Sequence, residues 1–575
     1  MSNVGTYGIR KIARIHDKSN DTYLDVIEFL ISKTESSRLE LLPSVVNEWR
    51  TFEKKLRDAG ASLPKNKGVL KQTLEAVAIS DAPEEWIYEK QTGWLKGRKA
   101  FVQVAGVIGN AEIETKIIGV NQSKAISDRS GKQSAAGKWK TWRDTVAGPA
   151  RYSTTLMLAI CVALAGPLLD IVRRQSFAIN LFGPSNAGKS MATLLAASVI
   201  GIARTLDLIS WKITNARLEE RLPEFNDSVF PIDDLNTMKG EYDEKYPRIR
   251  DLAYNIAQGQ ETARAAAYTA AHGGTHRTWN SIVLTSCEKS VHDMARLARL
   301  ERQQGESRRL IDVPAAFDGL AHVFDRAPED IGDIDAWKGL TFAALSDAVE
   351  QNHGRAFRKY IKSLVARRET LREDVEKSVD YFIRRARKNS DGEIARDVTQ
   401  KFGLIYAGGV LGIDCGLLPW TKRELLDAVM KSYIGARDLL PDSGVLLRRG
   451  KAAFKALRNR LPIIRQKDRL TFSYQNSDGF KERVKDRNRY LIKGEVFNNA
   501  FSSIEERDLV VNWLIEKARI TLATPKKSAA GLSRKPKEQP RWPDGERHRS
   551  VEIFWPRKQK MNEKKKKKTG AKKGE

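Results

Sequence analysis

Two kinds of hydrophobic pattern alternate in the middle of the chain. Short apolar blocks such as FAINLF (177–182), VFPI (229–232) and SIVL (281–284) have the length and composition of buried strands. Longer alanine- and leucine-rich segments such as MATLLAASVI (191–200) have the length of helices. Such alternation is typical of a parallel sheet with helices on both faces. The sequence therefore predicts an α/β core over residues 151–325.

One segment of this region is apolar enough to be compared with a membrane span. Residues 153–169 carry no charge, but they include Gly166 and Pro167 and are followed by Asp170. A spanning helix needs about 17–25 apolar residues, so this segment lies at the lower limit. We interpret it as a buried core helix and expect no membrane association.

The first 150 residues mix strand-like and helical patterns. YLDVIEFLI (23–31) is typical of a strand, and residues 41–60 read as an amphipathic helix with a proline near its start and a glycine at its end. TGWLKGRKAFVQVAGVIG (92–109) reads as two short strands. Residues 1–150 are therefore predicted to form an α+β accessory domain.

The C-terminal part divides into three segments. Residues 326–440 are mostly helical and are predicted to form a helical domain. Residues 441–556 contain a short helix within 488–520, a capping box formed by Ser503 and Glu506, and an amphipathic helix. RITLAT and RSVEIFW then alternate like the two strands of a hairpin. Helices followed by a β-ribbon are the layout of a winged helix, whose wing would be a long basic loop.

Charge distinguishes this chain from an average globular protein. Its 575 residues include 100 Lys plus Arg against 72 Asp plus Glu, a net charge of +28. Much of the excess lies in residues 525–549 and in the lysine-rich tail 557–575, which is predicted to be disordered. This sign favours an anionic polymer or surface as partner, and the charge alone does not say which.

Cysteine usage points to a reducing environment. Cys161, Cys287 and Cys415 are too few and too scattered for a disulfide framework or a cysteine-rich zinc site. We therefore expect a cytoplasmic protein without structural zinc.

The most specific motif is GPSNAGKS, which follows the predicted strand 177–182. It satisfies G-x-x-x-x-G-K-[ST], in which backbone N–H groups surround the β-phosphate and the lysine neutralises the β and γ oxygens. The serine hydroxyl is a ligand for Mg²⁺, and the helix that follows directs its positive end at the phosphates. The sequence predicts an ATP and Mg²⁺ site whose nucleotide-binding residues are Gly183, Pro184, Ser185, Asn186, Ala187, Gly188, Lys189 and Ser190.

Two later strands supply the polar groups that a nucleotide hydrolase needs. After the strand 229–232, Asp233 would hold Mg²⁺ together with Ser190, and Asp234 would polarise the attacking water. The usual base at this position is Glu, so a shorter Asp implies slow hydrolysis; a solvated surface pair is the alternative. After the strand 281–284, Ser286 or Thr285 would contact the γ-phosphate or the water.

Two basic features complete the candidate chemistry. Arg308 and Arg309 lead from a polar loop into a strand, where an arginine of an oligomeric ATPase can reach the neighbouring subunit's γ-phosphate; a solvated pair is equally consistent with the sequence. Alanine-rich arms around Gly273 and Gly274 suggest a β-hairpin, although an alanine-rich helix is the alternative. Its basic residues, the candidate nucleic-acid contacts, are Arg264, His272, His276 and Arg277.

These motifs, in this order, resemble the helicase-like P-loop ATPases of mobile genetic elements known as the domain of unknown function 927 family. The resemblance also covers the lead-in at 142–172, the stretch 211–219 and the segment 401–420. It implies an AAA+ type core akin to superfamily-three and poxvirus-type helicases, assembled as a homo-oligomeric ring, and it assigns Lys189, Ser190, Asp233, Asp234, Ser286 and Arg308 or Arg309 the roles given above. Asp234, where relatives more often have Glu, is the departure.

Three functions are consistent with this sequence. The first is an ATP-dependent DNA helicase or translocase acting as a hexameric ring in replication. The second is a nucleotide-gated DNA-binding switch, in which hydrolysis only resets the assembly. In the third, the basic C-terminus is an anchor to ribosomal RNA or the nucleoid. We favour the motor.

Overall fold

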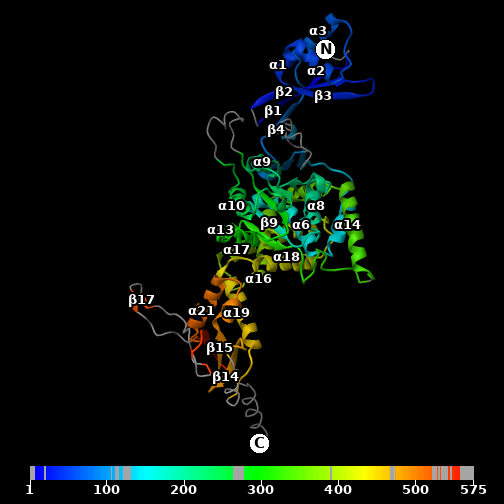
Figure 1. Cartoon of the computed structure of the whole chain (residues 1–575). Coiled ribbons are helices and arrows are strands. Elements are labelled where there is room, and N and C mark those ends of the chain that lie inside the picture. The colour runs from blue at the N-terminus through cyan, green and yellow to red at the C-terminus, as the bar shows by residue number, and fades with distance from the viewer. Residues whose placement is uncertain are drawn as a thin grey trace, which may run out of the picture. The chain divides into compact units, whose positions relative to one another are not determined.

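The chain folds into two compact units, drawn in Figure 1. The first comprises residues 1–387 and 396–439, and the second comprises residues 388–395 and 440–575. The predicted boundaries at 150 and 325 both fall inside the first unit, whereas the boundary at 440 lies at the start of the second. The computed structural model describes residues 7–18, 21–104, 106–109, 116–120, 131–262, 277–329, 331–388, 391–465, 472, 474–520, 527–528, 531–532, 540, 542–543 and 547–556.

The first strands form a five-stranded mixed sheet in the order β3-β2-β1-β4-β8. β2 pairs antiparallel with β1 and β3, and β4 pairs parallel with β1 and β8. The amphipathic segment 41–60 forms two helices, because the chain breaks at Glu48, whose carboxylate caps the second. The elements are β1 (Arg10–Asp17), β2 (Thr22–Leu30), β3 (Ser36–Leu41), α1 (Pro43–Asn47), α2 (Trp49–Asp58), α3 (Lys67–Ile79), β4 (Glu85–Glu89) and β8 (Lys116–Val120).

A small antiparallel sheet follows, with three strands instead of the two predicted: β5 (Gly93–Trp94), β6 (Ala100–Gln103) and β7 (Gly106–Gly109). It is tied to the parallel core by side chains. Thr92 Oγ1 donates to the Pro223 carbonyl at 2.9 Å, and the indole of Trp94 donates to the Pro167 carbonyl at 2.8 Å.

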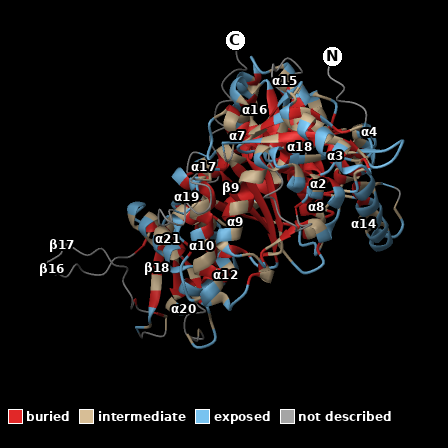
Figure 2. Cartoon of the chain, turned by 90° about the horizontal axis from the view of Figure 1, so that it is seen from above, coloured by how far each residue is buried: buried red, intermediate tan, exposed pale blue. Residues whose placement is uncertain are grey.

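The centre of the first unit is a five-stranded sheet in the order β10-β11-β12-β9-β13, in which every pairing is parallel. Its strands are buried, as the red ribbon around β9 in Figure 2 shows. Parallel strands are covered on both faces, which explains their nearly continuous apolar sequences. The strands are β9 (Phe177–Phe182), β10 (Ile209–Ser210), β11 (Ser228–Asp233), β12 (Ser281–Cys287) and β13 (Leu310–Pro314).

Helices cover this sheet. α6 and α8 pack together and contact β11 and β12, and α10 contacts β9. α14 is largely exposed (Figure 2). The helices of the first unit are α4 (Trp139–Trp142), α5 (Gly148–Ala150), α6 (Thr154–Ala165), α7 (Leu168–Ile171), α8 (Lys189–Ile200), α9 (Asn215–Arg221), α10 (Tyr242–Gln258), α12 (Val291–Leu297), α13 (Gln304–Ser307), α14 (Ile334–Gln351), α15 (Arg355–Ala366), α16 (Leu371–Ala386), α17 (Glu393–Asp414, which starts in the second unit) and α18 (Lys422–Arg437).

The uncharged segment 153–169 is a core helix, as expected. All twelve residues of α6 are buried, and Ser153 caps the helix by accepting from the Leu156 N–H. No helix in the described part of the chain is long and apolar enough to cross a membrane.

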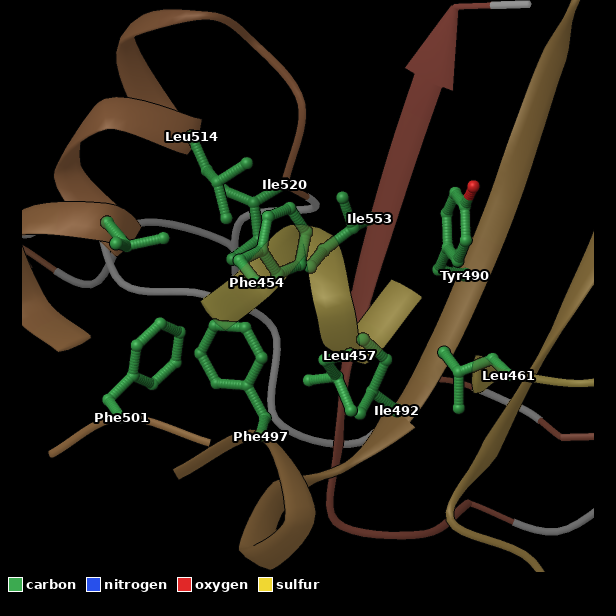
Figure 3. Packing of buried hydrophobic residues seen from close by; sticks show 11 residues of the cluster. Phe454, Leu457, Leu461, Tyr490, Ile492, Phe497, Phe501, Leu514, Ile520 and Ile553 are labelled. Carbon is green, nitrogen blue, oxygen red and sulfur yellow. The ribbon is translucent and has the colours of Figure 1, made fainter. Parts of the chain in front are cut away.

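The second unit contains three helices and a three-stranded antiparallel sheet in the order β14-β15-β18. In Figure 3, aromatic rings of α19 and α20 pack against aliphatic side chains of β15 and β18, and these residues form the unit's hydrophobic core. The elements are α19 (Ser443–Arg460), β14 (Gly479–Val484), β15 (Arg487–Lys493), α20 (Gly494–Asn499), α21 (Ile504–Glu516), the short pair β16 (Lys527–Ser528) and β17 (Gly531–Leu532), and β18 (Ser550–Pro556).

The structure adds a strand to this unit and describes only part of the predicted hairpin. Residues 487–493 form strand β15 ahead of the short helix, and β18 pairs along its whole length with β15. The predicted partner RITLAT contributes one bridge, between Ile520 and Ile553, and its residues 521–524 lie outside the described residues. Most of the basic loop 525–549 and all of the tail 557–575 also lie outside them.

The predicted capping box is half formed. Ser503 Oγ accepts from the Glu506 N–H at 3.1 Å. The Glu506 carboxylate, however, accepts from Arg449 Nε at 2.7 Å and from the Ser502 hydroxyl. Because this carboxylate is buried, it pairs with a cation instead of returning to the backbone.

Gly166 allows the end of α6 to approach the backbone of β11. A Cβ at this position would lie 2.4 Å from the Ser228 carbonyl carbon. We predict that Gly166→Ala lowers the free energy of unfolding by about 1–3 kcal/mol, since backbone atoms cannot yield as a side chain can. In Gly339→Ala, the matched control on exposed α14, a Cβ meets no atom within 4 Å. Chemical denaturation should show no loss for the control, and equal stability of the two variants would contradict the packing argument.

Asp227 is a buried carboxyl group at the start of β11. Its Oδ2 accepts from the Trp94 backbone N–H at 3.1 Å and from the Asn226 amide at 3.3 Å. Burial raises the pKa of Asp227 from 3.8 to about 7, against the opposing effect of the Trp94 hydrogen bond. The folded chain therefore keeps a proton that the unfolded chain releases between about pH 4 and 7.

The free energy of unfolding should fall as the pH rises from about 4 to 7. The titration of Asp227 alone should account for about 2–4 kcal/mol of this loss. Asp227→Asn, a neutral isostere, removes that part of the pH dependence and leaves the stability at pH 5 close to that of the parent. Thermal melting of both proteins from pH 4.5 to 8 measures it. Parallel melting curves across the series would show that Asp227 is charged in the folded state.

Candidate functional site

The motif GPSNAGKS connects β9 to α8, the strand-loop-helix order that a phosphate-binding loop requires. Gly188 has φ 101° and immediately precedes the first residue of α8. A Cβ at Gly188 would also lie 2.6 Å from the Phe342 ring. Both the backbone conformation and the close packing therefore require glycine here. Gly201, with φ 111°, ends the helix as predicted.

Lys189 is the first residue of α8, and its ammonium group turns back over the loop. Nζ donates to the Gly183 carbonyl at 3.0 Å and to the Pro184 carbonyl at 2.6 Å. Burial lowers the pKa of Lys189, and nearby Glu288, Asp234 and Asp233 oppose that effect. The ammonium group is thus held by neutral carbonyls, which leave its charge to an anionic ligand. The acidic groups nearby would repel an anion unless a metal cation lies between them.

Asp233 and Ser286 come from adjacent strands and contact each other. Ser286 Oγ donates to Asp233 Oδ1 at 2.7 Å and accepts from the Asp234 N–H at 3.2 Å. β12 lies between β9 and β11, so the loop and the aspartates follow strands that are not neighbours in the sheet. Ser286 occupies the intervening position and fixes the orientation of the Asp233 carboxylate.

Thr285 faces the other side of β12. Its Oγ1 accepts from the Trp211 indole N–H at 2.7 Å in a buried contact. Side chains alternate across a strand, so only one of Thr285 and Ser286 can face the loop. The structure selects Ser286.

Asp234 has an unusual backbone conformation for a non-glycine residue, with φ 51°. Its carboxylate accepts from the Asn236 N–H at 3.1 Å, and its carbonyl accepts from Thr237 Oγ1 at 2.8 Å. Asp tolerates the left-handed region and caps the following turn through a short side chain, which Glu does less well. This local geometry is a physical reason for Asp at a position where the sequence comparison expects Glu.

A cavity of about 410 Å³ lies over these groups. It is lined by residues 185–191 of the loop and α8, by Asp234 and by Ser286. Gly183 and Pro184 do not line it, but their carbonyls hold Lys189. Sequence reasoning missed five of the lining residues: Met191, which directly follows the motif, and Thr205, Asn236, Glu288 and Phe342.

Glu288 follows β12, two residues after Ser286, and could have been noticed as a carboxylate at a strand exit. Phe342 belongs to α14, more than 150 residues from the loop, and nothing in its local sequence distinguishes it from a core residue. An aromatic contact between Phe342 and Phe324, with ring centroids 4.9 Å apart, holds it beside the loop.

Arg308 and Arg309 are not brought to this cavity. They precede β13, at the amino end of the sheet, whereas the loop follows the carboxyl end of β9. The Arg309 guanidinium donates to the Gly305 carbonyl at 2.7 Å and stacks on Tyr254, 4.5 Å from the ring centroid.

The predicted hairpin lies mostly outside the described residues, including Arg264, His272 and His276. Its flanks are paired: Gln260 and Thr278 form an antiparallel bridge, and the Glu261 N–H donates to the Arg277 carbonyl at 3.0 Å. The Arg277 guanidinium lies 3.6 Å from Glu261 and 3.8 Å from Glu220, so these carboxylates compete with any nucleic-acid contact.

Comparisons with known proteins agree with this geometry at the level of the fold. A solved structure described as "SCCmec type IV Cch - active helicase" is 16% identical, with a TM-score of 0.51, and the match covers 96% of this chain and 93% of that one. "The A form apo structure of NrS-1 C terminal region-CTR" is 10% identical over 69% of this chain and 86% of that one, with a TM-score of 0.24, which is too low to support a shared fold.

Among curated proteins no sequence matches. The profile of the family described as "Domain of unknown function (DUF927)" matches residues 9–276, which include the phosphate-binding loop, Asp233 and Asp234, and it ends before Ser286, Arg308 and Arg309. Residues 9–276 of this chain are therefore similar to the DUF927 domain.

Proposed function

We propose that this protein is an ATPase of a mobile genetic element that moves along or separates DNA strands, with an AAA+ type core. The supporting observation is the cavity shared by three strand ends. Lys189 of the loop after β9, Asp234 after β11 and Ser286 of β12 all line the cavity. Asp233, the last residue of β11, does not line it but accepts a hydrogen bond from Ser286, which also accepts from the Asp234 N–H. Cations for phosphates, oxygen ligands for a metal and a carboxylate for water are the groups that phosphoryl transfer needs.

Magnesium fits this donor set. The Ser190 hydroxyl and the Asp233 carboxylate are hard oxygen ligands, and Mg²⁺ is usually bound by one or two protein groups together with phosphate oxygens and water. Bound there, the ion would neutralise charge on the phosphates. Ser286 would keep the Asp233 carboxylate oriented, and Asp234 would accept a proton from the attacking water.

The second unit supports DNA binding. Three helices with a three-stranded antiparallel sheet are the components of a winged helix, and the long loop between α21 and β18 carries the basic residues of the predicted wing. Phosphate contacts by lysine and arginine give affinity that falls with salt and does not depend on sequence. The structural neighbour that is a helicase is consistent with this assignment.

The position of Arg308 and Arg309 supports the proposal of a ring of identical subunits, which the sequence predicts to be a hexamer. These arginines lie at the sheet edge opposite the cavity, so within one chain they cannot reach its nucleotide. In a head-to-tail assembly the sheet edge with Arg308 and Arg309 in each copy faces the cavity edge of the next copy. A ring forms when the last copy contacts the first in the same way.

A switch without strand separation is the second candidate. Asp234 is already held by the Asn236 N–H, and a carboxylate that caps its own turn is a weaker base for water. Slow hydrolysis suits a protein whose ATP-bound form assembles on DNA. Processive strand separation driven by ATP would exclude a pure switch. The third hypothesis, in which the basic C-terminus is only an anchor, would be excluded if the chain without residues 557–575 still binds DNA.

We predict that Lys189→Ala abolishes DNA-stimulated ATP hydrolysis, lowering kcat/KM by at least about a hundredfold, because the β and γ oxygens lose their cation. Lys239→Ala removes the same charge at an exposed position three residues after Asn236 and should retain activity. Phosphate release and fork unwinding are measured side by side. Unwinding that survives Lys189→Ala would refute the motor.

Asp234 separates the two candidate functions. Asp234→Asn should lower kcat by about a hundredfold through loss of the base, and Asp234→Glu should raise it, by up to about tenfold, because the longer side chain extends farther into the cavity. Both substitutions change the carboxylate that accepts from the Asn236 N–H, so the unfolding temperature of each variant is measured as a control for lost stability. An unchanged kcat in Asp234→Asn would show that Asp234 is not the base and would favour Glu288, which also lines the cavity.

A further inference from the structure

The first unit carries a basic surface whose residues do not line the nucleotide cavity. It is formed by one side of α15 and by the short helix α4, which contacts α15. The cations of α15 occupy positions i, i+3, i+4 and i+7, so they share one side of the helix. The surface, called the basic face below, consists of Lys138, Lys140, Arg143, Arg355, Arg358, Lys359 and Lys362.

Both helices are fixed to the core through one residue of α8. The Trp142 indole donates to Ser198 Oγ at 3.0 Å, and the Gly354 N–H donates to the Ser198 carbonyl at 2.8 Å. The inner side of α15 is formed by buried residues, namely Ala356, Phe357, Tyr360, Ile361 and Leu364. The charged side of the helix is therefore held in a fixed orientation toward solvent.

Trp139 brings cations of the two helices together. Lys359 Nζ lies 5.2 Å from the centroid of its ring. Lys140 Nζ and the Arg143 guanidinium carbon each lie 5.9 Å from that ring. The negative face of an aromatic ring attracts cations and offsets part of their mutual repulsion. The ring does not neutralise them, so their charge remains available to an anion.

Few carboxylates compete for these cations. The sequence has no Asp or Glu in residues 129–143 or in residues 351–368. Within the part of the chain that the structure describes, the ion pair of the basic face joins Arg143 to Asp144 at 2.7 Å. The basic face therefore keeps most of its positive charge.

We propose that the basic face binds the phosphate backbone of duplex DNA, with residues of the first unit alone. Contacts of this kind position a protein on DNA without reading its sequence. From Arg355 to Lys362 the helix rises about 10 Å, the axial length of about three successive phosphates of one strand. This inference rests on the DNA partner of the proposed function, but it does not depend on ATP hydrolysis.

The chemistry of the surface favours a duplex over other anionic partners. A single strand is usually held by aromatic rings on which successive bases stack, whereas the ring of Trp139 is surrounded by cations. A helix that binds a membrane inserts its apolar side chains, but those of α15 are buried in the protein. A row of cations on a solvent-facing helix is suited instead to the phosphates on the outside of a duplex.

Binding of a short duplex oligonucleotide to the full chain, followed by fluorescence anisotropy without nucleotide, tests the surface. Arg355→Gln, Lys359→Gln and Lys362→Gln are combined in one variant. Its affinity for the duplex should fall at least about tenfold, because up to three phosphate contacts are lost. The slope of log Kd against log salt concentration should decrease by about 2–3 for the same reason.

The matched control combines Arg372→Gln, Lys377→Gln and Arg384→Gln on α16. It removes the same charge from exposed positions, and Arg372 and Lys377 already pair with glutamates. The control should leave the affinity and its salt dependence nearly unchanged, and thermal melting should show that both triple variants fold. Equal affinity of the parent and the basic-face variant would overturn the surface.

A second measurement needs no substitution. Lysines of the full chain are acetylated with and without the duplex, and the modified positions are identified by mass spectrometry. The duplex should protect Lys359 and Lys362 but not Lys377, which lies on the control helix. If the duplex protects neither Lys359 nor Lys362, the surface is overturned.

Parallel titrations distinguish the other partners. If the basic-face variant loses binding only to a single-stranded oligonucleotide or to phosphatidylserine vesicles, a duplex is not the partner. A parent chain that binds no DNA would refute the DNA partner of the proposed function together with this surface. A parent without ATPase activity whose duplex binding depends on the basic face would refute the ATPase and support the surface.

Discussion

The hydrogen bond from Ser286 to Asp233 is the contact on which the candidate site depends. β12 separates the strand that carries the phosphate-binding loop from the strand that carries the aspartates, so the two cannot contact each other through adjacent backbones. Ser286 fills this gap by donating to the Asp233 side chain and accepting from the Asp234 backbone. One hydroxyl can do both at once, which a purely apolar strand end could not.

Asp234 shows how local backbone geometry limits chemistry. The left-handed conformation and the bond to the Asn236 N–H fit a short side chain, and they hold the carboxylate close to its own turn. The same features that make Asp suitable for the turn reduce its reach into the cavity. For the base proposed above, turn geometry and reach are therefore in competition, and Glu288 is a second carboxylate that lines the same cavity.

The parallel sheet divides the charged groups of the first unit between two edges. Its carboxyl edge combines Lys189 with three acidic residues, and its amino edge gathers arginines with one aspartate. Since a strand's two ends are several residues apart, a single chain cannot bring both sets to one ligand.

The sequence alone determined the phosphate-binding loop, the order of strands and helices around it and the buried character of residues 153–169. These features depend on residues that lie close together in the chain. Glycines permit the loop, apolar runs have the length and spacing of strands or helices, and uninterrupted uncharged residues mark α6 as buried. The DUF927 resemblance was confirmed for the same reason, because motifs are local.

Only the tertiary structure decided which strands are adjacent, which of Thr285 and Ser286 faces the loop, and that Phe342 lines the cavity. Strand order and helix packing depend on contacts between residues far apart in the chain, and no local pattern encodes them. The pairing of β18 with β15 was missed for this reason, since several strands of suitable length could have paired with it. The same holds for the basic face, whose cations come from α4 and α15, two helices far apart in the chain that meet at Trp139.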